Sequence, residues 1–189
     1  MGDPGVKHPE ARSGPVIIGY DGSPTSEGAL VEAGRVLAGR RALVVVVWEP
    51  GPVFELAAAP SPTPAPIDMR SALEVEEKIY DGVRRLAEHG AALAREVGLE
   101  AEGLAVADDV TPAATLVRLA RERQAPALVV GTRGHRGVRH LLLGSTAEDV
   151  VRRAPCPVVV RGPGPEGQRR AEDDVLTTGR GEGGRRQDG

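Results

Sequence analysis

Short apolar runs alternate with longer amphipathic segments along the middle of the chain. The runs are rich in β-branched and aliphatic residues, and continuous runs of this kind are typical of strands that are buried on both faces of a parallel sheet. They predict five strands, at residues 16–18, 42–48, 104–107, 128–130 and 158–160.

Four segments between these runs have the apolar spacing of helices. The first follows Ser23 and Pro24, a favoured pair at a helix start, and stops at Gly39. The others span residues 68–98, about 112–124 and 145–154, and Pro155 ends the last. This alternation predicts an α/β fold with an open, doubly wound, five-stranded parallel sheet and helices on both faces, which is a Rossmann-like arrangement.

Three segments lie outside this pattern. Residues 1–14 have no apolar run and are expected to form a flexible leader. Residues 49–67 contain six prolines, which neither continue a helix nor pair inside a sheet, so a Pro- and Ala-rich loop is expected there. Residues 162–189 contain eight glycines and eleven charged residues, which predict a disordered, charged tail. One domain remains, at residues 15–161.

Composition narrows the class of protein. The 189-residue chain has a formal net charge of −3 and only 2% aromatic residues, so it lacks the positive charge and stacking platforms of nucleic-acid binders. Its single cysteine, Cys156, allows no intramolecular disulfide and fits a reducing compartment, so a cytoplasmic location is expected. No apolar run approaches the roughly 20 residues that cross a bilayer, and no membrane association is expected.

Two predicted strands end in the same way, at the edge where open α/β sheets bind ligands. The sequences VIIGYDG, from Val16, and LVVGTRG, from Leu128, both place Gly-x-x-Gly after an apolar run. Glycines allow the backbone to approach a ligand closely. The first turn carries Asp21, whereas the second carries Arg133 and is followed by His135.

The second turn continues into a candidate phosphate site. After Gly134 and nine intervening residues, the chain reaches Gly144, Ser145 and Thr146 at the start of a predicted helix. Backbone amides in a glycine turn and at a helix N-terminus converge on phosphate oxygens, and the two hydroxyl groups add further donors. The alternative is that Ser145 only caps the helix.

These residues resemble the nucleotide signature of the universal stress protein family, G-x-x-G, nine residues, G-[ST]. Gly131, Gly134, Gly144 and Ser145 match it, and VIIGYDGSPTSEGAL and APCPVVVR resemble the family's first strand and its last helix-to-strand turn. The resemblance covers about residues 15–161. It implies a five-stranded, adenine nucleotide alpha-hydrolase-like fold and ATP at the ends of the first and fourth strands. It also implies a homodimer through the last strand, with Val158, Val159 and Val160.

The resemblance also implies roles for individual residues. Asp21 would contact the adenosine, and Val47 would pack on the adenine. The ATP is expected to carry Mg²⁺, with no metal ligand implied in the chain. The residues implied to hold the ribose and phosphates are Gly131, Gly134, Gly144, Ser145 and Thr146, with Arg133 and His135 at variable positions of the motif. Two alternatives stay open: Asp21 is a turn-forming acid, and Val47 is a core residue.

Other chemistries lack support in the sequence. The dinucleotide fingerprint, the P-loop and the nucleophile elbow are missing, and His135 and His140 have no third partner at metal-ligand spacing. No lysine or base is evident for a γ-phosphate, so hydrolysis is expected to be slow at most. The resulting hypothesis is an ATP-dependent regulatory switch in stress response, acting on an unidentified protein partner. The alternative is a nucleotide-independent, dimeric interaction module. Cys156 is expected to be a packing residue, with a redox sensor as the alternative.

Overall fold

The computed structural model describes residues 12–49, 51, 69–108, 110–132 and 143–162. This part of the chain contains one parallel sheet with the strand order β3-β2-β1-β4-β5. The strands are β1 Val16–Gly19, β2 Arg41–Trp48, β3 Glu100–Ala107, β4 Leu128–Gly131 and β5 Val158–Arg161. The predicted class, an open five-stranded α/β fold, is confirmed.

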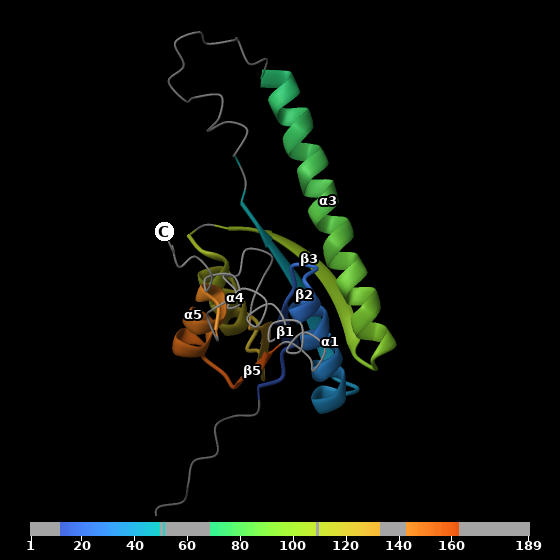
Figure 1. Cartoon of the computed structure of the whole chain (residues 1–189), viewed down its shortest axis with the longest axis vertical. Coiled ribbons are helices and arrows are strands. Elements are labelled where there is room, and N and C mark those ends of the chain that lie inside the picture. Colours follow the sequence, from blue (N-terminus) through green and yellow to red (C-terminus); the bar gives the residue numbers. More distant parts are fainter. Residues whose placement is uncertain (1–11, 50, 52–68, 109, 133–142, 163–189) are drawn as a thin grey trace, which may run out of the picture.

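Helices cover both faces of the sheet, as predicted (Figure 1). The helices α1, Pro24–Leu37, and α3, Met69–Glu96, lie on one face. The helices α4, Pro112–Glu122, and α5, Ser145–Arg153, lie on the other and pack against each other. The chain therefore forms three layers, with the sheet in the middle.

The core consists of two apolar layers, one on each face of the sheet. Val16 and Ile18 pack on the side of α1 and α3, whereas Ile17 between them packs on the side of α4 and α5. All three are fully buried. The continuous apolar runs in the sequence follow from this arrangement, because both faces of each central strand are covered.

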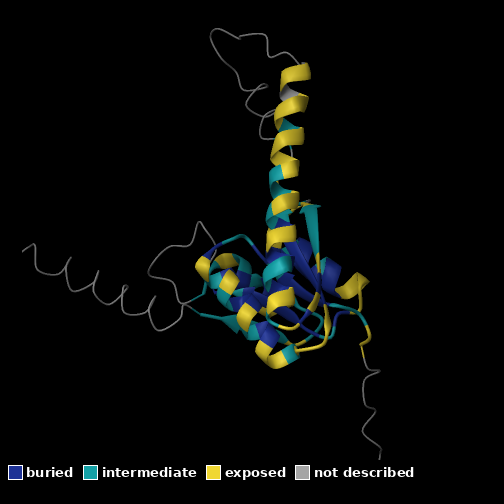
Figure 2. Ribbon diagram, turned by 90° about the vertical axis from the view of Figure 1, so that its right-hand side faces the viewer, coloured by how far each residue is buried: buried dark blue, intermediate teal, exposed yellow. Residues whose placement is uncertain are grey.

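Helix α3 is longer than the sheet it covers. Its last three turns carry the buried residues Ala87, Ala91 and Ala94, but Leu73 near its beginning is 55% exposed. Figure 2 shows this first half of α3 projecting from the domain. The first half of α3 contacts the end of β2, where the ring centroids of Trp48 and Tyr80 lie 5.6 Å apart.

One strand differs clearly from its prediction. The apolar run predicted a strand at residues 104–107, but β3 begins at Glu100. β3 is an edge strand, and its first residues alternate between the exposed Glu100 and Glu102 and the buried Ala101. Alternation of this kind does not form a continuous apolar run, so the start of β3 was predicted four residues too late.

The segments predicted to lie outside the domain are described only in part. In the expected leader, the Gly14 amide donates to the Gln124 carbonyl over 3.3 Å, and the Arg12 guanidinium donates to the Ala125 carbonyl over 3.4 Å. Residues 1–11, most of the loop at 49–67 and residues 163–189 lie outside the described residues. Among the described helices, none combines the length and apolar character needed to span a membrane.

Candidate functional site

The candidate site lies where β1 and β4 meet at the carboxyl edge of the sheet. These strands are parallel neighbours, with Ile17 opposite Leu128 and Ile18 opposite Val129. The chain leaves β1 toward α1 on one face and leaves β4 toward α5 on the other. Loops that diverge in this way leave a crevice at the strand ends, where open α/β sheets bind ligands.

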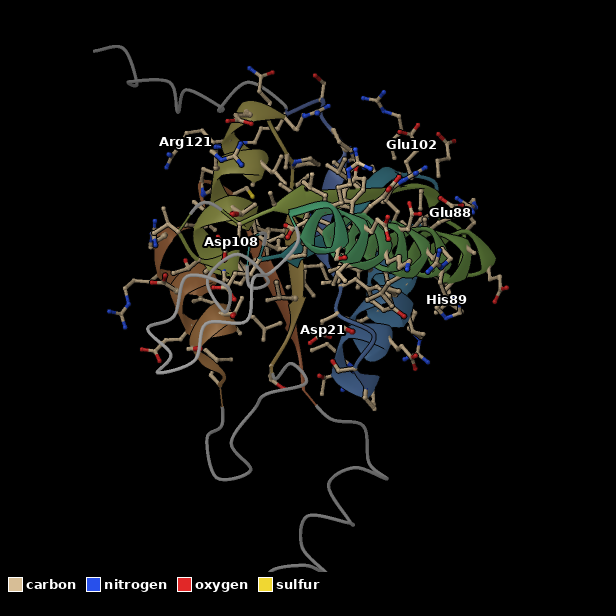
Figure 3. The ribbon with its side chains drawn as sticks, turned by 90° about the horizontal axis from the view of Figure 1, so that it is seen from above. Asp21, Glu88, His89, Glu102, Asp108 and Arg121 are labelled. Carbon is tan, nitrogen blue, oxygen red and sulfur yellow. The ribbon has the colours of Figure 1, made fainter. Side chains whose placement is uncertain are left out.

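Asp21 follows β1 and organises the turn into α1. Its Oδ1 atom accepts hydrogen bonds from the backbone amide and the hydroxyl of Ser23, at 3.0 and 2.6 Å. Ser23 is the N-cap of α1, and its hydroxyl oxygen accepts from the Ser26 amide over 3.3 Å. Asp21 is therefore a turn-forming acid, as the alternative for this residue states. The residue is half-buried and lies at the carboxyl edge of the sheet (Figure 3).

Gly131 ends β4 and lies against the backbone of α1. A Cβ atom at this position would lie 2.9 Å from the carbonyl carbon and 3.0 Å from the carbonyl oxygen of Thr25. Real side chains do not approach backbone so closely, so only glycine fits without movement of α1. The glycine brings the end of β4 up to the first turn of α1.

Thr132 connects three parts of the site. Its amide donates to the carbonyl of Arg161 over 2.9 Å, and its carbonyl accepts from the Gly144 amide over 2.6 Å. Its side chain is buried, and its Oγ1 atom has no hydrogen-bond partner in the described part of the chain. Thr132 could not be recognised from the sequence, because a lone threonine in a turn carries no signal of burial.

The start of α5 supplies backbone donors. Gly144 is the N-cap, with φ −72° and ψ 158°, and no side chain among the described residues makes a capping hydrogen bond. The alternative in which Ser145 only caps the helix is therefore wrong: Ser145 is the first helical residue and is exposed, and Thr146 follows it. An N-terminus without a side-chain cap presents amide groups and the positive end of the helix dipole, which together attract an anion.

Val47 lies one residue before the end of β2 and pairs with Val106 of β3. It is half-buried and packs against the core on the side of α4 and α5. Val47 therefore makes a core contact, as the alternative for this residue states. The rest of its side chain is accessible near the carboxyl edge.

Three predicted site residues, Arg133, Gly134 and His135, lie outside the described residues. The remaining six, together with Thr132, come from the ends of β1, β2 and β4 and from the start of α5. In the part of the chain that the structure describes, no group of three His, Cys, Asp or Glu side chains is arranged to hold a metal ion.

Comparison with known proteins gives a consistent result. The model of the universal stress protein family matches residues 13–161. The universal stress protein in the QAH/OAS sulfhydrylase 3'region of Thermus aquaticus is 33% identical over 153 residues, which cover 77% of this chain and 96% of that relative.

Solved structures share the fold. A universal stress protein in complex with cAMP superposes with a TM-score of 0.55 at 24% identity, covering 80% of this chain and 98% of that one. An Arabidopsis thaliana family protein with AMP bound gives a TM-score of 0.53 at 18% identity, covering 82% and 94%. The match of the family model over most of the sequence and the 33% identity to the Thermus aquaticus relative show that the chain belongs to the universal stress protein family.

Proposed function

We propose that this protein binds an adenine nucleotide, ATP with Mg²⁺, in the crevice between the ends of β1 and β4. The observation that carries the proposal is the pairing of Gly144 with Thr132, which sets an uncapped helix N-terminus beside the end of β4. The buried Thr132 hydroxyl, without a partner among the described residues, fits a ligand group that accepts or donates a hydrogen bond. The solved relatives with cAMP and AMP support an adenine nucleotide as the ligand.

In this proposal each element holds one part of the nucleotide. Asp21 contacts the adenosine, and Val47 packs on the adenine. The phosphates lie at the start of α5, against the amides of Gly144, Ser145 and Thr146. The remaining contacts to the ribose and phosphates come from Gly131, Arg133, Gly134 and His135. Mg²⁺ is held largely by the phosphates and water, because this ion usually takes only one or two protein ligands at phosphate sites.

The chemistry of the chain favours a switch over a fast catalyst. Its two lysines are Lys7, in the expected leader, and Lys78, in the projecting half of α3, and neither belongs to the strand ends that form the site. With no lysine there and no base evident in the sequence for the γ-phosphate, the site is expected to bind ATP without accelerating its hydrolysis strongly. The bound nucleotide then sets the conformation or the choice of a regulatory protein partner during stress in the reducing cytoplasm.

We also propose that two copies pair through β5. This strand is the edge of the sheet next to β4, and Val158, Val159 and Val160 are all half-buried. An apolar edge strand is an aggregation liability unless another strand covers it, and antiparallel pairing with a second copy would do so. Sedimentation at micromolar concentration should therefore give a dimer, and a monomer would contradict this part of the proposal.

The nucleotide proposal is tested by the substitution Asp21→Asn. Asparagine keeps the Oδ1 acceptor for the Ser23 amide, so the turn into α1 is retained while the charge is removed. Calorimetric titration should show affinity for Mg-ATP reduced about tenfold, a loss of about 1.4 kcal/mol. The matched control is Asp81→Asn, an exposed carboxylate on α3 that should leave binding unchanged. Equal affinities in both variants would place the nucleotide elsewhere.

A turnover assay separates the switch from an enzyme. The proposal expects ATP hydrolysis slower than about 1 per second, the low end of ordinary enzyme rates. A faster turnover that Asp21→Asn abolishes would make the site catalytic and would overturn the binding-switch proposal.

A further inference from the structure

The helices α4 and α5 leave a groove of about 510 Å³ on the face of the domain opposite α1 and α3. Its floor is largely apolar, with Thr115 as the one polar side chain among the described lining residues apart from the arginines. Val117 is buried, Ala114 is half-buried, and Val110, just before α4, is 79% exposed and among the most exposed apolar residues of the described chain. The groove is therefore an accessible apolar surface that a short apolar segment could cover.

The rim of this groove is basic. It carries Arg118 and Arg121 from α4 and Arg153 from α5. Figure 3 shows Arg121 at the outside of the molecule, beside α4. Three guanidinium groups around an apolar floor suit a segment with several carboxylates next to aliphatic side chains, because each guanidinium pairs well with a carboxylate.

The existing ion pairs of the rim leave it able to bind carboxylates. Arg118 lies 3.3 Å from Glu122, and Arg153 lies 2.9 Å from Asp149, each one helical turn apart. All four side chains are more than a third exposed, and exposed pairs of this kind contribute little to stability. A guanidinium group has five N–H donors, so Arg153 keeps donors for a second carboxylate beside its pair with Asp149.

The chain itself contains a segment with the complementary pattern. Glu172, Asp173 and Asp174 are its only three consecutive acidic residues, and Val175 and Leu176 follow directly. These two are the only large aliphatic residues in the sequence from position 162 onward. The three carboxylates are complementary in charge to the basic rim, and the two aliphatic side chains that follow suit the apolar floor.

The connection is long enough to reach the groove. Nine residues, 163–171, separate the end of the described chain at Gly162 from Glu172. Extended chain spans at most about 3.3–3.6 Å per residue, so these nine reach about 30 Å. Helix α4 has 11 residues, which at 1.5 Å per residue is about 17 Å long. Because α5 packs against β5 and α4 packs against α5, a reach longer than α4 itself allows residues 172–176 to lie along α4.

We propose that residues 172–176 dock in the groove between α4 and α5 of the same chain. The three carboxylates pair with Arg118, Arg121 and Arg153, and the two aliphatic side chains cover the apolar floor. None of the described residues that line this groove is among the proposed nucleotide contacts, so this proposal stands or falls independently of nucleotide binding.

The test places a spin label beside the docking segment of the full-length protein. The label is attached at Thr178→Cys in a Cys156→Ser background, and the amide resonances are followed by NMR. Docking predicts that Ala114, Val117 and Arg121 lose most of their signal, while α1 and α3 keep theirs. Uniform attenuation, or none along α4, would overturn the proposal.

Charge variants give a matched control. The triple substitution Glu172→Gln, Asp173→Asn and Asp174→Asn should restore the α4 signals. A second triple, Glu166→Gln, Glu182→Gln and Asp188→Asn, removes the same charge from other parts of the tail and should leave the attenuation intact. Equal effects of the two triples would contradict specific docking.

A charge exchange tests the rim directly. Arg121→Glu should abolish the attenuation, and adding Asp173→Arg should restore it. Raising the salt to about 0.5 M should weaken it, since the Debye length then falls to roughly 4 Å. If the double variant Arg121→Glu with Asp173→Arg does not regain the attenuation, the rim does not pair with this segment.

Mixing experiments decide whether the segment belongs to the same chain. Spin-labelled protein without isotopes is mixed with isotope-labelled protein without a spin label. Docking within one chain predicts no attenuation in the mixture. Attenuation of α4 in the mixed sample would assign the groove to the tail of a second copy and overturn the proposal as stated.

Discussion

The Gly144 amide donates a hydrogen bond to the Thr132 carbonyl over 2.6 Å. These residues stand at the two ends of the stretch that follows β4, twelve positions apart in the sequence. Their contact fixes the start of α5 beside the last residue of β4, so Gly131 and Gly144 of the glycine motif lie at the same edge of the sheet. The amide groups at the N-terminus of α5 are thereby positioned for an anion before any ligand arrives.

Replacing Gly131 should destabilise the fold. A Cβ at this position would collide with the backbone of Thr25, which cannot move without shifting α1. We expect Gly131→Ala to lower the free energy of unfolding by about 2 kcal/mol, in the range of overpacked sites. Urea unfolding measures this change. Gly131 thus has a packing role that is separate from any contact with phosphate.

Gly28→Ala is the control for that substitution. Gly28 lies inside α1, and a Cβ there would meet only the Arg161 side chain at 3.6 Å, an ordinary contact. Alanine is the better helix former by about 0.8–1 kcal/mol, so this variant should be slightly more stable than the wild type. If Gly131→Ala had the same free energy of unfolding as Gly28→Ala, α1 would have to shift at little energetic cost.

Thr132→Val separates ligand binding from stability. Valine keeps the shape of threonine but removes a buried hydroxyl that has no partner among the described residues. Such a group costs about 1–3 kcal/mol when unsatisfied, so nucleotide-free protein should gain about 1 kcal/mol in its free energy of unfolding. Affinity for ATP should fall in the same variant. A loss of stability would instead reveal a structural partner for the hydroxyl.

Tyr20 should make stability decline at alkaline pH. Its ring packs closely against Gly90 of α3, and its hydroxyl is buried without a partner in the described chain. Burial, followed by the charges of Glu27 and Asp21, raises the pKa of Tyr20 above its usual 10.0. The native state then holds the phenolic proton more tightly than the unfolded chain does. This contribution is fully present below about pH 10 and is lost as the pH rises through the pKa of the folded protein.

Tyr20→Phe should therefore reduce the fall in the free energy of unfolding between about pH 8 and pH 10.5. Tyr80→Phe is the matched control, since Tyr80 is 40% exposed. The comparison requires urea unfolding of both variants at each pH. The same pH dependence in the two variants would show that the Tyr20 phenol is not the group responsible.

Cys156 should react slowly with alkylating reagents. Burial raises the pKa of its thiol, and the nearby Arg12 charge opposes this only in part. Little thiolate is then present at neutral pH, and the thiolate is the reactive form. Iodoacetamide should modify the folded protein at least about tenfold more slowly than the urea-unfolded protein, by the loss of thiolate and access. Equal rates would support the redox-sensor alternative over a packing role.

Local sequence patterns predicted the central part of the fold well. The run at Val16, Ile17 and Ile18 indicated a strand buried on both faces, because side chains of either orientation had to be apolar. The edge strand β3 was predicted less accurately, since exposed residues at Glu100 and Glu102 carry no apolar signal. Apolar patterns in a sequence indicate which residues are buried, and the edge strands of a sheet are only partly buried.

The site was predicted at the level of its motif, but not in its contacts. The spacing of Gly131, Gly144 and Ser145 follows from the sequence alone. The packing of Gly131 on Thr25 and the burial of the Thr132 hydroxyl, which has no partner among the described residues, depend on segments far apart in the chain. Long-range contacts of this kind leave no local pattern. For the same reason, the exposed first half of α3 could not be distinguished from its buried second half.

The most direct test of nucleotide binding is the ligand content of the purified protein combined with its affinity for ATP. The protein is denatured, released nucleotides are identified by mass, and ligand-free protein is titrated with Mg-ATP by calorimetry. The account predicts a released adenine nucleotide or saturable binding of one Mg-ATP per chain. If no adenine nucleotide is released and none binds, the crevice is not a nucleotide site, and a nucleotide-independent interaction module becomes the better description.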